Sequence, residues 1–306
     1  MNLRKALLTL SIVIMSPNFL SAHQSELTTH SKTLASSLSN PFVISAEKAR
    51  ELCEYFHLET EELLQQLIPI AQSYALPPIS NYKVGAAALG KSGAIYLGVN
   101  LEFAGLPLNA TVHAEQFLIT LARAHGETEL AAIAVSAAPC GHCRQFMNEM
   151  DETGHLQILI PGFSAIPLST LLPKSFGPKD LGLSGNLLTA PSRSHAADER
   201  MSLIDHATRA ASNSYAPYSD SKSGIAILTL SGKVYTGSYL ENAAFNPSLS
   251  PLQAALITLV ADMGKYEEIK EVILVEQSSA KITQEMTSRE ILGSIAPDTQ
   301  FTVLKR

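Results

Sequence analysis

The sequence predicts an α/β fold: a three-layer α/β/α domain with a mixed sheet, present twice, whose second copy lacks the metal ligands of the first. Three observations support this prediction. Strand-like and helix-like segments alternate between residues 84 and 160, residues 199–306 repeat that order, and a histidine–cysteine pattern occurs in the first run only. Such alternation is typical of helices covering both faces of a sheet.

Each element of the first copy has its own signal. Small apolar residues around a Gly90 to Gly93 turn predict a hairpin, and the apolar run LAAIAVS predicts a buried strand. Acidic residues at Thr60-Glu61-Glu62 suit a helix start, and Pro77-Pro78 suits its end. The expected order is helices within Ser45–Tyr74, strands Val84–Leu89 and Ala94–Val99, helix His113–Ala124, strand Leu130–Ser136, helix Gly141–Met150 and strand Leu156–Ile160.

The second copy keeps the frame of the first. GKVYTG at Gly232–Gly237 matches GAIYLG at Gly93–Gly98, and Glu241 falls where Glu102 does. A helix opening at Ser250 stands where the first copy has HAEQ, and no cysteine follows it. The second copy is therefore expected to bind no metal. Its Leu240–Phe245 loop is either ordinary turn chemistry or a wall of a neighbouring active site.

Composition limits the classes of function. The chain has 306 residues, 46% hydrophobic and 16% charged, with a formal charge of −6, which describes an ordinary globular protein of two domains. Without a basic tract or tryptophan, nucleic acid is not an expected partner. Three cysteines exclude a disulfide framework, and Cys53 reads as a small buried apolar residue.

The N-terminus allows two interpretations. Arg4 and Lys5 precede an apolar run at Ala6–Met15 and a small-residue segment ending at Ala22, the order of a secretory signal. The alternative is a helix packed on the next domain. The run is too short to span a membrane, so no stable membrane insertion is expected. Cytoplasmic localisation is the prediction, with export as the alternative if residues 1–22 are cleaved.

One motif carries the chemistry. His113 opens HAEQ, and Cys140 and Cys143 stand three apart in PCGHC. One imidazole and two thiolates leave a fourth position for water, the composition of a catalytic zinc site, and Glu115 can lie nearby without being a ligand. Alone, CxxC can be a redox pair or two packed thiols, and HxE an acidic helix start. Together they form the pattern of zinc-dependent nucleobase deaminases.

Other polar or exposed residues have two readings each. Asn100 and Glu102 share one face of an extended segment, either to clamp a hydroxyl or to cap the next turn. Phe176, in Leu168–Leu181, is either the tip of a lid or part of a packed connector. His142 is expected to be solvated, or to support a ligand from beside it, rather than to be a ligand. Arg144 either hydrogen-bonds a thiolate or lies on the surface.

From Ser45 onward the chain resembles the cytidine deaminases, specifically the longer bacterial type with a vestigial second domain. The resemblance is carried by SNYKVG, GVNLEF, TVHAEQ, PCGHCRQFMNE, FGPKDL and GSYLENAAFNP. It implies a homodimer, one Zn²⁺ per chain and a small nucleoside substrate, cytidine or 2′-deoxycytidine, deaminated to the uridine counterpart and ammonia. Separately, the Ser/Thr/His-rich stretch Gln24–Ile44 predicts a linker or loosely ordered arm, and the Ser/Pro/Ala-rich stretch Leu188–Asp198 predicts a linker between domains. The chain is thus expected to divide into a leader or arm (1–44), a catalytic domain (45–188), a linker (189–198) and a vestigial domain (199–306).

Matching motifs imply a role for each site residue. Zinc is held by His113, Cys140 and Cys143, with Glu115 as the proton shuttle. Asn100 and Glu102 hold the ribose 3′-hydroxyl, and Ala114 also contacts the substrate. Tyr82 stacks on the ring, although the family commonly has phenylalanine there, and Phe176 covers the pyrimidine. The partner chain's Leu240–Phe245 loop approaches the 5′ side of the ribose.

Two rival functions share parts of this pattern. A nucleic-acid editing deaminase has the same zinc motif, but the acidic charge and a clamped free 3′-hydroxyl argue against a continuing strand. A non-catalytic protein that uses zinc for stability, nucleoside binding or dimerisation needs no carboxylate such as Glu115. Water activated by zinc at a pKa of about 7, with one carboxylate to move its protons, favours hydrolytic deamination.

Overall fold

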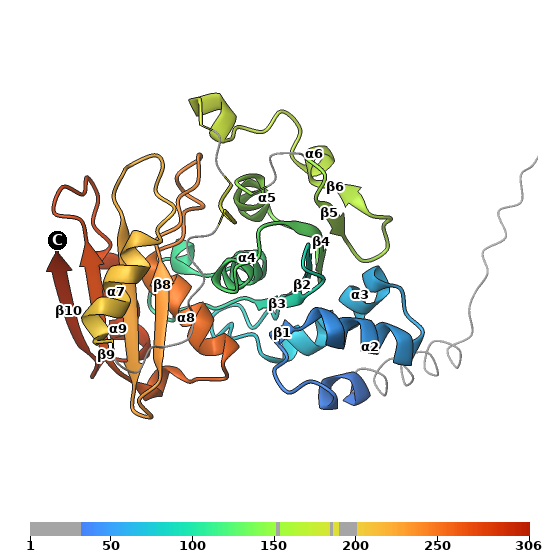
Figure 1. The fold of residues 1–306 in the computed structure, drawn as a ribbon, viewed down its shortest axis with the longest axis horizontal. Helices are drawn as coiled ribbons and strands as arrows, with labels where there is room; N and C mark the ends of the chain where they lie inside the picture. The colour runs from blue at the N-terminus through green and yellow to red at the C-terminus, as the bar shows by residue number, and fades with distance from the viewer. Residues whose placement is uncertain (1–31, 151–153, 184–185, 190–200) are drawn as a thin grey trace, which may run out of the picture.

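The computed structural model describes residues 32–150, 154–183, 186–189 and 201–306 (Figure 1). The predicted leader at 1–22 and all but the first residue of the predicted linker lie outside this part of the chain. No helix in the described residues has the length and apolar character needed to cross a bilayer.

The first domain is built on a mixed sheet with strand order β1-β3-β2-β4-β5-β6. The hairpin strands β2 and β3 pair antiparallel, and β4 runs parallel to β5 after a crossover through α5. The elements are β1 (Val43–Ile44), α2 (Ala46–Phe56), α3 (Thr60–Ser73), β2 (Gly85–Gly90), β3 (Ile95–Val99), α4 (Ala114–Ala124), β4 (Leu130–Val135), α5 (Gly141–Asn148), β5 (Gln157–Leu159), β6 (Ile166–Pro167) and α6 (Leu168–Leu171). The predicted order of elements is confirmed.

Two glycines show that helices cover both faces of this sheet. A Cβ on Gly85 would lie 2.7 Å from the Ile68 carbonyl of α3, whereas a Cβ on Gly98 would lie 2.1 Å from the Ala114 carbonyl of α4. Gly98 is paired with the residue after Gly85, so the two glycines point to opposite faces. Figure 1 shows the same arrangement, with α2 and α3 on one side and α4 and α5 on the other. The three-layer prediction is confirmed.

The second domain repeats this plan with a sheet of order β10-β9-β7-β8, in which β10 runs parallel to β9. Helices α7 and α8 again pack on opposite faces, against Gly224 and Gly237. The motifs did not predict the final helix and strand. The elements are α7 (Leu203–Ser212), β7 (Ser223–Thr229), β8 (Val234–Ser238), α8 (Pro251–Ala261), β9 (Ile269–Glu276), α9 (Glu285–Ile295) and β10 (Gln300–Lys305).

Residues 32–44 are not the loosely ordered arm that the sequence predicted. Residues 32–36 are helical, and Leu34 is buried. Phe42 is 1% exposed and stacks on Phe117 of α4, and β1 extends the sheet beside β3. The prediction was wrong because a two-residue strand and a single aromatic anchor leave no hydrophobic periodicity to detect.

The two domains pack through α4 and α8, with a reciprocal pair of hydrogen bonds at the N-termini of these helices. Gln116 Nε2 donates to the Pro247 carbonyl at 3.1 Å, and Gln253 Nε2 donates to the Ala110 carbonyl at 2.7 Å. Each carbonyl lies three residues before the N-cap of the helix in its own domain. The domains are therefore related by a local pseudo-twofold axis.

We expect Gly98→Ala to lower the free energy of unfolding by about 1–3 kcal/mol, the usual cost of overpacking, and to weaken zinc binding by displacing the start of α4. Gly237→Ala is the matched control, because its Cβ would lie 2.1 Å from the Pro251 carbonyl in the metal-free domain. Urea unfolding and zinc titration measure the two effects. Equal loss of zinc affinity in both variants would contradict the idea that this strand sets the position of α4.

Candidate metal centre and active site

Two helix N-termini carry the predicted metal ligands. His113 is the N-cap of α4 and Cys140 is the N-cap of α5, with Cys143 one turn further along α5. The two helices contact each other on one face of the sheet. In the second domain a serine, Ser250, takes the place of the histidine and caps α8 through its hydroxyl oxygen. Among the described residues, His113, Cys140 and Cys143 form the one cluster with the composition and spacing of a metal site.

The separations of the three ligand atoms fit a tetrahedral zinc site. Cys140 Sγ lies 3.5 Å from Cys143 Sγ, and His113 Nδ1 lies 3.6 Å and 3.3 Å from the two sulfurs. Ordinary zinc bond lengths in a regular tetrahedron place two sulfurs about 3.8 Å apart, and sulfur and nitrogen about 3.6 Å apart. The separations of the three ligand atoms are therefore close to those that a tetrahedral zinc site requires. One imidazole and two thiols are also the donor types that zinc prefers.

The two cysteines of the cluster affect the pKa values of each other. Hydrogen bonds from Cys143 and His113 lower the pKa of Cys140 to about 3. The same contact with Cys140, together with burial, raises the pKa of Cys143. Metal ligands bind in their deprotonated form, so a bound dication would stabilise both cysteines as thiolates.

Glu115 lies beside the ligands in the first turn of α4. It is 4% exposed, and burial raises the pKa of its carboxyl group. The neighbouring Cys143 and His113 oppose this rise in the pKa, whereas the charge of Cys140 adds to it. A carboxyl whose pKa is raised toward neutrality is suited to accept and return a proton.

Arg144 does not make the hydrogen bond to a thiolate that was one of its two expected roles. Its guanidinium donates to the carbonyls of Pro139 and Leu171, both at 2.8 Å, and not to a thiolate. This arginine therefore fixes the backbone just before Cys140. His142 stacks on His113, with ring centroids 4.8 Å apart, and its Nε2 is buried without a hydrogen-bond partner in the described residues. It lies outside the ligand cluster and packs against one of the ligands, so the expectation of a solvated side chain is wrong and that of a supporting neighbour fits.

Asn100 and Glu102 hold the 79–84 loop. Glu102 accepts hydrogen bonds from the backbone amides of Ile79 and Ser80, both at 2.9 Å, and from the Ser80 hydroxyl. Asn100 accepts from the Val84 amide and donates to the Tyr82 carbonyl. These contacts do not include the metal ligands.

The metal-free domain repeats the Glu102 arrangement. Glu241 accepts hydrogen bonds from the Tyr218 and Ser219 amides and from the Ser219 hydroxyl. The glutamate at this position therefore holds its loop whether or not a metal site is present. Such a structural role was one of the two readings of the sequence.

Phe176, Tyr82 and Ala114 have different surroundings. Phe176 is 47% exposed, which excludes the reading as a core residue, and its carbonyl accepts hydrogen bonds from Gln145 and Asn148 of α5. Tyr82 is 60% exposed, and Ala114 is fully buried between the two metal-site residues of α4. Neither Gln145 nor Asn148 was predicted to be a site residue, because their only signal in the sequence was their place in the RQFMNE motif.

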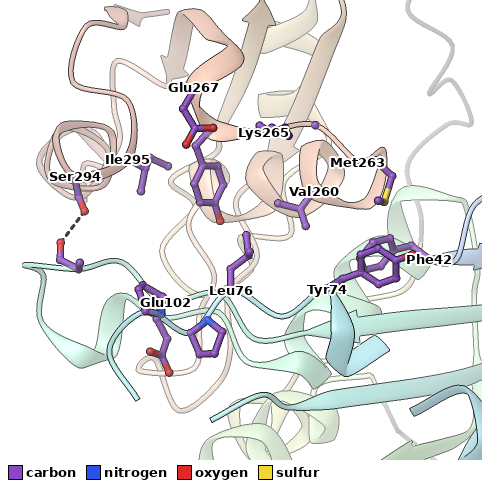
Figure 2. Close-up of a pocket in the computed structure, with 15 residues that line it drawn as sticks. Phe42, Tyr74, Leu76, Glu102, Val260, Met263, Lys265, Glu267, Ser294 and Ile295 are labelled. Carbon is purple, nitrogen blue, oxygen red and sulfur yellow. Dashed lines mark hydrogen bonds between the residues drawn. The ribbon is translucent and has the colours of Figure 1, made fainter. Parts of the chain in front are cut away.

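A cavity of about 730 Å³ lies elsewhere, between the two domains (Figure 2). Figure 2 shows Leu76 and Glu102 on the first-domain side, facing Val260 and Ile295 of the second domain. The zinc-ligand cluster and Glu115 do not line it. The cavity is largely apolar and is distinct from the site of the chemistry.

Both halves of the chain match the same family of known proteins. Two models of the cytidine and deoxycytidylate deaminase zinc-binding region match, at residues 58–158 and 168–289. The cytidine deaminase of Proteus mirabilis (strain HI4320) is 46% identical over 244 residues, 80% of this chain and 83% of the relative. That of Yersinia pestis (strain Pestoides F) is 44% identical over 255 residues, 83% and 87% of the two chains.

A solved structure, cytidine deaminase from Mycobacterium tuberculosis, aligns over 38% of this chain and 97% of that chain, with 31% identity and a TM-score of 0.36. The second family match begins at residue 168, ahead of the boundary at 188, so the limits of the domains stay predictions.

A three-layer domain that presents two thiols, an imidazole and a buried carboxylate at adjoining helix N-termini defines a zinc-binding hydrolytic deaminase. The length and identity of the shared sequence then specify the group. This chain belongs to the cytidine deaminase family.

Proposed function

We propose that the protein catalyses zinc-dependent hydrolytic deamination of cytidine and 2′-deoxycytidine, releasing ammonia and the uridine counterpart, in pyrimidine salvage. The observation that carries this proposal is the placement of Glu115 beside the His113, Cys140 and Cys143 cluster. The names of the relatives support the nucleoside, since both relatives are called cytidine deaminase.

Zinc held by these ligands supplies Lewis acidity and a water that is nucleophilic near neutral pH. Glu115 takes one proton of that water and delivers it to N3 while the new C4–O bond forms. It then carries the remaining water proton to the amino group as the C4–N bond breaks and ammonia leaves. Both protons of one water are thus accounted for, and a single carboxylate returns to its starting state.

For the ribose, we propose that Asn100 and Glu102 bind the 3′-hydroxyl in addition to holding their loop. A carboxylate has about four lone-pair positions, and the loop uses three of those on Glu102. Tyr82 and Phe176 are exposed aromatic rings whose backbone carbonyls are held by Asn100 and by α5, respectively, and they are proposed to stack on and cover the pyrimidine. Ala114, which lies between His113 and Glu115, is also proposed to contact the substrate.

We also propose a cytoplasmic homodimer, with export as the alternative if residues 1–22 are cleaved. Asn242 and Ala243 of the Leu240–Phe245 loop are buried against α5 of their own chain. Ala244 and Phe245 of this loop are exposed, Phe245 to 69%, and remain available to a partner.

A panel of substrates tests the proposal. We expect ammonia release from cytidine and 2′-deoxycytidine, and at least roughly 10²-fold less from cytosine and from a cytidine-containing oligonucleotide, because remote ribose contacts contribute to turnover. Activity on the oligonucleotide alone would favour the editing reading. Zinc binding without any turnover of nucleosides would favour the non-catalytic one.

A further inference from the structure

The helix that carries both cysteines is anchored at its far end by the metal-free domain. Glu149 directly follows α5 and is 0% exposed. Its carboxylate accepts hydrogen bonds from the hydroxyls of Tyr215 and Tyr218 and from the Ala243 amide at 2.9 Å. All three donors belong to the second domain. We propose that Glu149 is a positioning residue for the zinc site, through which the metal-free domain sets the placement of α5.

The chemistry of this contact requires all its parts. A buried carboxylate is costly unless charged or polar donors satisfy it, and here three donors do so. Burial and the Glu149 carboxylate raise the pKa values of Tyr215 and Tyr218, which keeps both phenols protonated as donors. Glutamine at this position would put an amide nitrogen, which only donates, in place of one carboxylate oxygen, so at least one of these donors loses its acceptor and the helix end is released.

A second set of contacts links the same domain to the opening of the site. Asn242 Nδ2 donates to the Gln145 carbonyl at 3.0 Å, and Gln145 Nε2 donates to Asn242 Oδ1 at 3.4 Å. The same Gln145 Nε2 donates to the Phe176 carbonyl at 2.8 Å. Helix α5 thus connects the second domain to both the zinc ligands and the proposed cover of the pyrimidine.

The pseudo-twofold relation shows that this anchor is present on one side only. The positions equivalent to Tyr215 and Tyr218 in the first domain are Leu76 and Ile79, which have no hydroxyl and are 40% and 41% exposed. Leu76 lines the interdomain cavity of Figure 2, next to the end of α9. The tyrosine hydroxyls therefore contact the end of α5, the helix that carries the metal-binding cysteines. In the other half of the molecule, the apolar cavity lies at the corresponding place beside α9, which carries no metal ligand.

The inference rests on the proposed zinc-dependent reaction, but metal binding tests it independently of turnover. We expect Glu149→Gln to weaken zinc binding by about 10- to 100-fold, the usual effect of losing a residue that orients ligands. In the Co²⁺-substituted protein, the visible ligand-field bands should shift, because the cysteine sulfurs change their angles. The double variant Y215F/Y218F should show the same changes in milder form.

Glu276→Gln is the matched control. Glu276 is 2% exposed and accepts hydrogen bonds from Thr283 and the Gln284 amide, all inside the second domain. It should lose comparable stability in urea while leaving the zinc affinity and the Co²⁺ spectrum as in the parent protein. Parental zinc affinity and spectrum in a folded Glu149→Gln protein would overturn the proposal, as would equal changes in both variants. If Glu149→Gln weakens zinc binding as expected but the parent protein does not deaminate nucleosides, only the proposed function is refuted.

Discussion

Replacing Glu115 with alanine is expected to lower the turnover of cytidine by at least roughly 10²-fold while the protein keeps its zinc, because a general acid–base group is lost and no ligand is. Glu115 stands outside the ligand cluster, and its buried side chain is adjacent to Cys143. Steady-state ammonia release and elemental analysis of the purified protein measure the two quantities.

The control for Glu115 is another buried glutamate of the same domain. Glu127 is 4% exposed, and its carboxylate accepts a hydrogen bond from Ser92. Glu127→Ala should lower the free energy of unfolding but leave the turnover of the folded protein within a few-fold of the parent, since surviving structure still presents Glu115. Near-normal ammonia release by the Glu115→Ala protein would refute its role as the proton shuttle.

Replacing Cys140 with alanine should abolish both zinc binding and deamination. Two of three protein ligands remain, and none in the described second domain can replace the third. Zinc content should fall from about one per chain toward zero, because three protein ligands are the usual minimum of a catalytic site. Colorimetric zinc release, together with a turnover assay in added zinc, measures the loss.

Cys53→Ala is the matched control for cysteine loss, since Cys53 is half-buried in α2 and outside the cluster. It should retain one zinc per chain and parental turnover. Full zinc occupancy of the Cys140→Ala protein would remove Cys140 from the ligand set. Zinc loss in the Cys53 variant would mean that the metal responds to global stability instead.

The metal site was predictable because its residues carry their chemistry in their identities. His113, Cys140 and Cys143 have few other reasons to stand at helix starts, and the structure brings their ligand atoms within 4.8 Å of one another. The order of helices and strands along the chain, and the three-layer arrangement, followed from the segment types and the duplication. Helix N-termini at one sheet edge then made the convergence of HAEQ and PCGHC expected.

The remaining parts depend on partners distant in sequence. Glu149 and Tyr215 are 66 residues apart, and nothing local to either distinguishes a buried acceptor from a solvated helix end. The hydrogen-bond partners of Arg144 could not be predicted either, because they are the backbone carbonyls of Pro139 and Leu171, and a backbone carbonyl gives no signal in the sequence. Glu102 and Glu241 make the same pattern of hydrogen bonds to their loops, which shows that a glutamate in a shared motif can persist because of the loop that it holds.

The reciprocal Gln116 and Gln253 contacts have a consequence for assembly. An interface in which each half gives the same bond that it receives is the kind by which two separate identical subunits pair. Covalent fusion of the two halves makes their encounter intramolecular, so it no longer depends on protein concentration. Dilution that would separate a pair of single-domain chains leaves this pair intact. These interdomain hydrogen bonds need only a glutamine side chain and a backbone carbonyl, and no metal. One half can therefore lose its metal ligands and still serve as the covalently attached partner of the other.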